Sequence, residues 1–170
     1  AKLRTYEHGV IVWTASHGAV HVVGNILKKW ESLGGFNNPT LGNPVTPEGL
    51  YSLSVVTPTS DTIQKFEFGV IMNRPTVGNQ AFEVHGAIFQ RWSSVGVLTQ
   101  VGLPRSDELP TADGKGRISR FDRGSIVWDR DTNATTIIRS IGMKLVSPGN
   151  ALNNKLLFLT SVAPASLGGL

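Results

Sequence analysis

The feature that most constrains this chain of 170 residues is a short pattern that occurs three times. In each copy an aromatic residue is followed by an acidic residue, a spacer, a glycine and a stretch that contains branched side chains. The copies span residues 6–13, 66–73 and 121–128. Self-similarity at this spacing is typical of repeat proteins, in which each unit packs on its neighbours.

Two of the copies continue in parallel. Residues 23–35 match residues 85–96, and residues 41–48 match residues 101–108. In the first of these blocks the apolar side chains recur at helical spacing, as Ile26, Trp30 and Leu33 and again as Ile88, Trp92 and Val95. Glycines follow at positions 34–35 and 96 and predict the helix ends. We therefore expect both tryptophans of these helices in the core.

The opening block alternates in period two, which predicts a strand paired in a hairpin across the turns at residues 16–18 and 77–79. One unit is then a hairpin, a short helix and a Gly-Pro turn. Because such a unit cannot bury both its strand face and its helix face alone, units must pack side by side. The predicted fold class is α+β, mostly β: a tandem array of about two and a half units, each a hairpin, a short helix and a turn.

The predicted organisation is a single repeat domain over residues 1–170. In the third unit a return strand is expected at residues 135–139, but no helix with a central tryptophan follows. Residues 143–146 and 156–162 are expected as short strands, and residues 163–170 as a tail. The predicted boundaries are repeat 1 at 1–56, repeat 2 at 57–114, partial repeat 3 at 115–146, and a divergent closing segment and tail at 147–170.

Composition excludes several classes of protein. Hydrophobic residues make up 40% of the chain and charged residues 16%, which argues against disorder over most of its length. Cysteine is absent, so disulfides and Cys-bound metals are excluded. The 16 Lys and Arg residues outnumber the 12 Asp and Glu residues and slightly favour anionic partners, but they form no dense run, and no nucleic-acid partner is expected. No segment is apolar enough for a membrane span, and the first residues hold no hydrophobic signal core; either the protein is not exported or the signal has been removed.

The repeated pattern resembles the LGFP repeat family, named for the Leu-Gly-Phe-Pro turn that ends each unit. The aromatic-x-x-Gly-x-Ile-x-Trp strand and the Gly-x-Ile-x-x-x-Trp helix of that family are also present, so the resemblance covers residues 5 to 140 or so. Asn73 stands where tryptophan is usual. The two turns are Leu41-Gly42-Asn43-Pro44 and Val101-Gly102-Leu103-Pro104.

The resemblance implies an extracytoplasmic module of actinobacteria, often appended to mycoloyltransferases, amidases or other wall enzymes. In such proteins the repeats are thought to dock the enzyme onto the arabinogalactan–peptidoglycan layer, with the units arranged like blades around an axis. It leaves three possibilities open: a part of a larger enzyme, a stand-alone binder, and a phage-encoded protein that recognises the same wall.

Catalytic motifs are missing from the sequence. There is no Gly-x-Ser-x-Gly elbow, phosphate-binding loop or dinucleotide fingerprint. A glycoside hydrolase would need a carboxylate pair, but the candidates Glu7, Glu67 and Asp122 recur once per repeat, so we expect them to be structural and to bond the backbone of the neighbouring unit. His17 and His21 lack an acid at helical spacing, and residues 129–140 lack the glycine and glutamate of a calcium loop; no metal or cofactor is predicted.

The predicted ligand contacts lie where strands end next to turns. Trp13 and Trp128 each end a strand, where an indole either packs in the core beside Ile11 or Ile126 or stacks on a sugar ring. Polar side chains at the same ends can hydrogen-bond sugar hydroxyls or phosphate. The predicted binding residues are Trp13, Asn73, Arg74, Asn79, Trp128 and Arg130.

Together these features predict a non-catalytic module that binds cell-wall glycan, either arabinogalactan or peptidoglycan, outside a bacterium. The expected partners are that polysaccharide and either a parent enzyme or further copies of the chain. Two alternatives stay open. One is a small wall hydrolase with a carboxylate pair, and the other is a structural or assembly subunit that uses the repeat face for protein contact.

Overall fold

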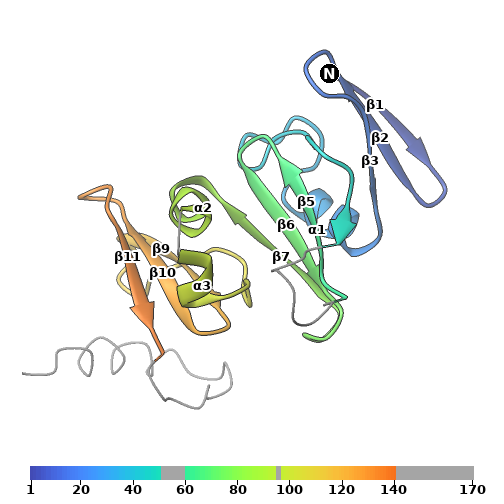
Figure 1. Ribbon diagram of the computed structural model, residues 1–170. Helices are drawn as coiled ribbons and strands as arrows, with labels where there is room; N and C mark the ends of the chain where they lie inside the picture. Colours follow the sequence, from blue (N-terminus) through green and yellow to red (C-terminus); the bar gives the residue numbers. More distant parts are fainter. Residues whose placement is uncertain (51–59, 95–96, 141–170) are drawn as a thin grey trace, which may run out of the picture.

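A computed structural model describes residues 1–50, 60–94 and 97–140. In this part of the chain, consecutive strands form three small antiparallel sheets (Figure 1). Sheet 1 contains β1 (Lys2–Tyr6), β2 (Gly9–Thr14) and β3 (Gly18–Val23). Sheet 2 contains β4 (Gly49–Leu50), β5 (Thr62–Phe66), β6 (Gly69–Arg74) and β7 (Gln80–His85). Sheet 3 contains β8 (Leu109–Pro110), β9 (Gly116–Phe121), β10 (Gly124–Asp129) and β11 (Thr135–Arg139).

A helix follows the first sheet and another follows the second. These are α1 (Gly24–Ser32) and α2 (Gly86–Ser93), and the short α3 (Val97–Val101) comes after α2. The predicted tryptophans are buried, with Trp30 and Trp92 only 1% and 4% exposed, as are Ile26 and Ile88. Leu33 is partly buried, and Val95 lies outside the described residues. Gly34 and Gly35 have positive φ angles directly after α1, which confirms the predicted glycine end of that helix. Gly96, the corresponding prediction for α2, lies outside the described residues. No helix among the described residues is long and apolar enough to cross a membrane.

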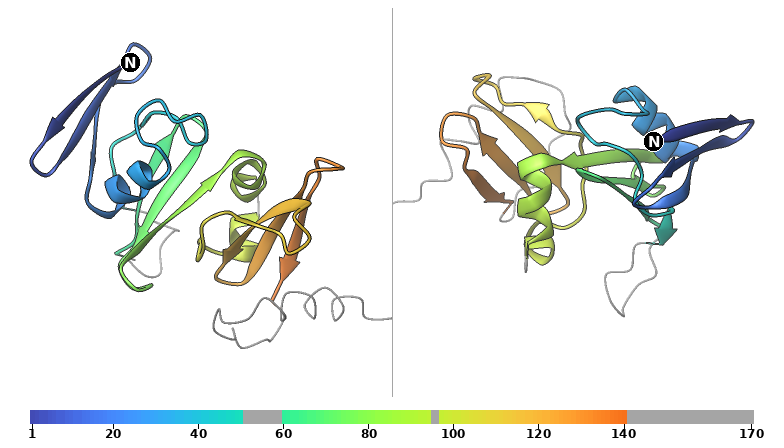
Figure 2. Two further views of the ribbon diagram at one scale, coloured as in Figure 1. Left: turned by 180° about the vertical axis from the view of Figure 1, so that it is seen from behind. Right: turned by 90° about the horizontal axis from the view of Figure 1, so that it is seen from above.

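Sheets and helices alternate along the molecule, so that each long helix lies between two successive sheets (Figures 1 and 2). One core combines sheet 1, α1 and one face of sheet 2; the other combines the opposite face of sheet 2, α2 and sheet 3. Sheet 2 is therefore covered on both faces, and its consecutive residues Val70, Ile71 and Met72 are all buried. The α+β, mostly β class is confirmed.

One prediction about the unit is wrong. The opening block was expected to be one strand from its aromatic residue onward, but the aromatic ends one strand and the next begins three residues later. In sheet 1, Tyr6 pairs with Gly9 across a tight turn, and Gly9 also pairs with Val23. A Cβ on Gly9 would lie 2.8 Å from the carbonyl oxygen of Val22, so this central position requires glycine. Each unit thus contains a meander of three long strands rather than a hairpin, and sheets 2 and 3 have a further two-residue strand at one edge.

The predicted turns and the predicted return strand are confirmed. The hairpin turns at residues 16–18 and 77–79 join β2 to β3 and β6 to β7, and the return strand of the third unit is β11. The strands expected at 143–146 and 156–162, and the tail, lie outside the described residues.

Candidate functional site

The two Leu-Gly-x-Pro-type turns join one unit to the next. The first turn docks on the β5–β6 turn of sheet 2, where the backbone N–H groups of Glu67 and Phe68 donate to the carbonyl oxygens of Asn43 and Leu41, both at 3.0 Å. The carboxylate of Glu67 accepts in return from the N–H of Asn43 at 2.8 Å. Trp30 of α1 completes the joint, because its Nε1 donates to the carbonyl of Gly42 at 3.0 Å.

The second turn repeats this geometry on sheet 3. The N–H groups of Asp122 and Arg123 donate to Leu103 and Val101 at 2.9 and 2.7 Å, and the carboxylate of Asp122 accepts from the N–H of Leu103 at 3.1 Å. The indole of Trp92 donates to the carbonyl of Gly102 at 2.9 Å. The structural role predicted for the recurring acids is therefore confirmed for Glu67 and Asp122, while Glu7 is exposed and, among the described residues, its carboxylate contacts only His8, at 3.6 Å.

Arg74 belongs to the second joint. It is 6% exposed, and its guanidinium donates to Asp61 at 3.2 Å, to the carbonyl of Pro104 at 3.0 Å and to Asp122 at 2.9 Å. Burial alone would raise the pKa of Asp122, but the hydrogen bonds from Arg74 and Arg105 outweigh it and hold that pKa below its usual value. A buried arginine with these three bonds links the second unit to the third, and the predicted contact of Arg74 with a ligand stays a prediction.

A second buried cluster was not predicted from the sequence. Nδ1 of His85 lies 2.6 Å from the Glu83 carboxylate, and its Nε2 lies 3.6 Å from Glu108, which also accepts from Arg117 at 2.9 Å. Burial alone would raise the pKa of Glu83 and lower that of His85. The hydrogen bond between Glu83 and His85 and the attraction of their opposite charges outweigh burial. The pKa of Glu83 is therefore lowered and that of His85 is raised. The cluster ties sheet 2 to sheet 3. Within the described ranges no group of three or more His, Asp or Glu side chains could hold a metal ion.

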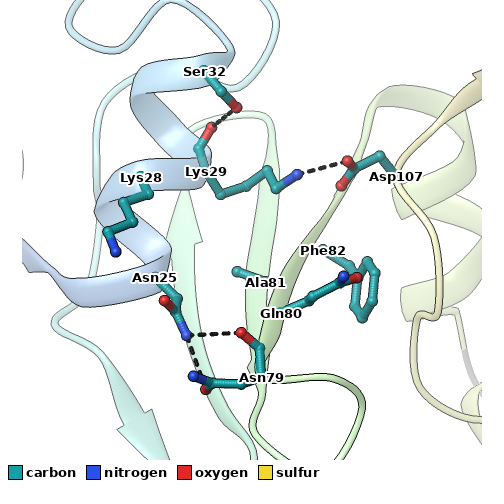
Figure 3. A pocket seen from close by; sticks show the side chains of 9 residues that line it. All are labelled: Asn25, Lys28, Lys29, Ser32, Asn79, Gln80, Ala81, Phe82 and Asp107. Carbon is teal, nitrogen blue, oxygen red and sulfur yellow. Dashed lines mark hydrogen bonds and ion pairs between the residues drawn. The ribbon is translucent and has the colours of Figure 1, made fainter.

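An open polar groove lies between α1 and sheet 2 (Figure 3). Its volume is about 410 Å³. Two contacts cross it: Lys29 Nζ lies 2.6 Å from an Asp107 carboxylate oxygen, and Asn25 Nδ2 donates to the backbone and side-chain oxygens of Asn79 at 3.2 and 3.1 Å. The same Asn25 nitrogen lies 3.1 Å from Oδ1 of Asn73. The lining residues are Asn25, Lys28, Lys29, Ser32, Asn79, Gln80, Ala81, Phe82 and Asp107.

Comparison with protein families gives a match to the LGFP repeat over residues 1–37 and 101–149, together just over half of the chain. The chain belongs to the LGFP repeat family. Repeats of this family are associated with cell-wall proteins. A comparison with curated proteins found no match. Residues 38–100 lie outside the matched LGFP segments, yet β5, β6, β7 and α2 repeat the arrangement of the first unit.

The structure distributes the predicted binding residues of this LGFP protein over separate places. Asn73 and Asn79 lie beside the polar groove, as the hydrogen bonds of Asn25 show. Trp128 packs partly against the second core and donates to Asn133 Oδ1 at 2.9 Å, while Arg130 donates to the carbonyl of Gly114 at 3.3 Å in a neighbouring turn.

Trp13 lies apart from all of these, on the outer face of sheet 1. It is 46% exposed, and Lys2 Nζ lies 5.7 Å from its ring centroid. The interpretation of Trp13 as a core residue is therefore wrong. Alternation in β2 points Val10, Val12 and Thr14 toward α1, so Ile11 and Trp13 face the opposite side, which no other described element covers.

Proposed function

We propose that this chain is a non-catalytic module that binds cell-wall glycan, and that the groove between α1 and sheet 2 holds the polymer. The association of LGFP repeats with cell-wall proteins supports the wall as the target. The observation that carries the proposal is the convergence of amide and ammonium groups from two repeat units on one open groove.

The chemistry of the groove suits an anionic or hydroxyl-rich polymer. Side-chain amides both donate and accept, as sugar hydroxyls do. Asn25 Nδ2 is already bonded to Asn79 Oδ1, so the groups offered to a sugar are Asn25 Oδ1, Asn79 Nδ2 and the amide of Gln80. Lys28 is exposed and has no partner among the described residues, so its ammonium is free to pair with a phosphate or carboxylate. The volume lies within the range of about 300–1,000 Å³ that is usual for small-molecule sites, and the groove is open to solvent.

The contacts of the recurring acids support a non-catalytic role. A hydrolase needs carboxylates that reach a scissile bond, whereas those of Glu67 and Asp122 accept hydrogen bonds from the backbone at the joints. Weak binding at one groove would gain strength from repetition along a polymer or from a host enzyme that binds the same wall.

The test is retention of the purified chain on insoluble actinobacterial wall, before and after arabinogalactan is stripped. We expect retention that falls when the polysaccharide is removed, and a further loss of about tenfold for Lys28→Glu, since one charge-assisted contact is worth about 1.5 kcal/mol or more. Lys65→Glu makes the same change of charge at an exposed lysine on sheet 2 that does not line the groove.

Two results would contradict the proposal. One is no retention of the unaltered chain on either material, and the other is an equal loss of retention for Lys28→Glu and Lys65→Glu. Trp13→Ala forms a separate arm, which tests the predicted stacking of that indole on a sugar. A loss confined to Trp13→Ala would place the glycan on the outer face of sheet 1 instead of in the groove.

A further inference from the structure

The outer face of sheet 1 lacks a cover that the other two sheets have. Tyr6, Phe66 and Phe121 occupy the same position, at the end of the first long strand of their units. Phe66 is 4% exposed and Phe121 1%, because a preceding unit covers each of them, whereas Tyr6 is 53% exposed. Figures 1 and 2 show the β1–β2 hairpin at one end of the molecule.

Each covered aromatic meets the helix tryptophan of the unit before it. The ring centroids of Trp30 and Phe66 are 6.0 Å apart, and those of Trp92 and Phe121 are 6.1 Å apart. Tyr6 has no such partner among the described residues. A hollow of about 360 Å³ lies next to it instead, lined by Tyr6, Glu7, His8, Gly9, Val10, Ile11, His21 and Val23.

The hydrogen-bonding groups of the joint are also present at this end. In sheets 2 and 3 the acid and the residue after it donate two backbone N–H groups to a Leu-Gly-x-Pro-type turn, and the acid's carboxylate accepts one N–H. The corresponding groups of sheet 1 are the N–H groups of Glu7 and His8 and the Glu7 carboxylate. Within the described part of the chain, none of them is bonded to a turn.

The exposure of Trp13 fits the same pattern. Its counterparts are Asn73, which accepts a hydrogen bond from Asn25 of α1, and Trp128, which packs on the core that contains α2. Both counterparts are thus engaged by the preceding helix. The outer face of sheet 1 therefore has an apolar hollow, an exposed indole, and two N–H groups and a carboxylate that bond no turn among the described residues. These are the groups with which sheets 2 and 3 bind the preceding unit.

We propose that the outer face of sheet 1 docks a further LGFP repeat unit. The tryptophan of that unit's helix packs against Tyr6, and its Leu-Gly-x-Pro turn bonds the N–H groups of Glu7 and His8 and the Glu7 carboxylate. A second copy of this chain is the poorer occupant, because both of its turns, at 41–44 and 101–104, are already docked on its own sheets.

The test supplies such a unit in the same polypeptide. Residues 1–60 are fused directly ahead of Ala1, which keeps the spacing between turn 41–44 and the next unit, since Lys2 corresponds to Thr62. We expect amide hydrogen exchange at Glu7 and His8 of the original unit to slow by about tenfold or more, the change that a newly formed hydrogen bond of about 1.4 kcal/mol produces.

Substitutions then show whether the new joint resembles the known ones. Glu7→Ala leaves the urea midpoint unchanged in the 170-residue chain and lowers it in the extended chain. Glu67→Ala, at a joint that both chains contain, lowers the midpoint in both. Glu31→Ala, an exposed acid on α1, is the matched control and has the same small effect in both chains. Trp30→Ala in the added copy alone abolishes the new protection.

Two outcomes overturn the proposal. In the first, the extended chain folds with the protection of sheets 2 and 3 intact, but Glu7 and His8 exchange as before. In the second, the 170-residue chain is a dimer in which these amides are already protected and lose protection on dilution, so that a second copy is the occupant. No glycan is present in either measurement, so the result is independent of wall binding.

Discussion

The substitution Gly42→Ala tests the joint between the first two units most directly. Gly42 has a φ of +79°, and a Cβ at this position would lie 2.5 Å from Glu67 Oε2 and 2.6 Å from Glu67 Cβ. The carboxylate oxygen can rotate away, but the Cβ of Glu67 is fixed by its backbone. The turn must therefore move off sheet 2, which stretches or breaks the hydrogen bond from Asn43 to Glu67.

The expected cost has two parts. A residue other than glycine in the left-handed region costs about 1–2 kcal/mol, and a lost hydrogen bond to a charged group costs about 1.5–3 kcal/mol. The sum is about 2.5–5 kcal/mol, which is a large fraction of the 5–15 kcal/mol that typically stabilises a domain. Gly18→Ala measures the backbone cost alone, because Gly18 has a φ of +70° but nothing lies within 4 Å of the added Cβ.

The measurement is urea unfolding of the two variants and the unaltered chain, followed by tryptophan fluorescence, with the midpoint shift converted to a free energy at constant slope. We expect Gly18→Ala to cost about 1–2 kcal/mol and Gly42→Ala to cost at least about 1.5 kcal/mol more. If the two variants agree within about 0.5 kcal/mol, the close docking of the turn on Glu67 does not stabilise the joint and the reasoning is refuted.

Two further predictions concern the second joint. Trp92→Phe removes the donor to the buried carbonyl of Gly102 and should destabilise the chain by about 1–3 kcal/mol, whereas Trp13→Phe at the exposed position should cost less than about 0.5 kcal/mol in the same urea experiment. For pH, the lowered pKa of Glu83 contributes stability that is complete above the usual glutamate pKa of 4.5 and is lost as pH falls through its folded-state pKa. The raised pKa of His85 contributes stability that is complete below 6.5 and is lost as pH rises through its folded-state pKa. The unfolding free energy should therefore be highest between pH 4.5 and 6.5 and fall on both sides. His85→Gln should flatten the decline above pH 6.5, and an unchanged decline would contradict a stabilising role of the His85–Glu83 pair.

Several features followed from the sequence because they depend on local spacing. The helical spacing of Ile26 and Trp30 identified the buried face of α1, and the recurrence of Glu67 and Asp122 with the fold identified them as structural. Asn79, which the sequence predicts as a ligand contact, lines the groove, and its contact with a ligand stays a prediction.

Other features could not be read from the sequence. The strands β1, β5 and β9 were missed because they contain few apolar residues in alternation. The bond of Arg74 to Asp122 joins residues 48 positions apart, and the cluster of Glu83, His85 and Glu108 joins two sheets. No local pattern reports which distant side chains a packed joint brings together.

The sequence by itself determined the repeat, the central strand of each unit, the helix of the first two units, and the recurring acids and Gly-Pro turns, because these depend on periodicity and on turn chemistry within about a dozen positions. Only the tertiary structure decided which copies of a motif are buried. Tyr6 and Phe66 have the same local surroundings in the sequence, yet one is exposed and the other lies under Trp30. Burial of a repeat face depends on whether a neighbouring unit covers it, and that is a property of the assembled array rather than of any one segment.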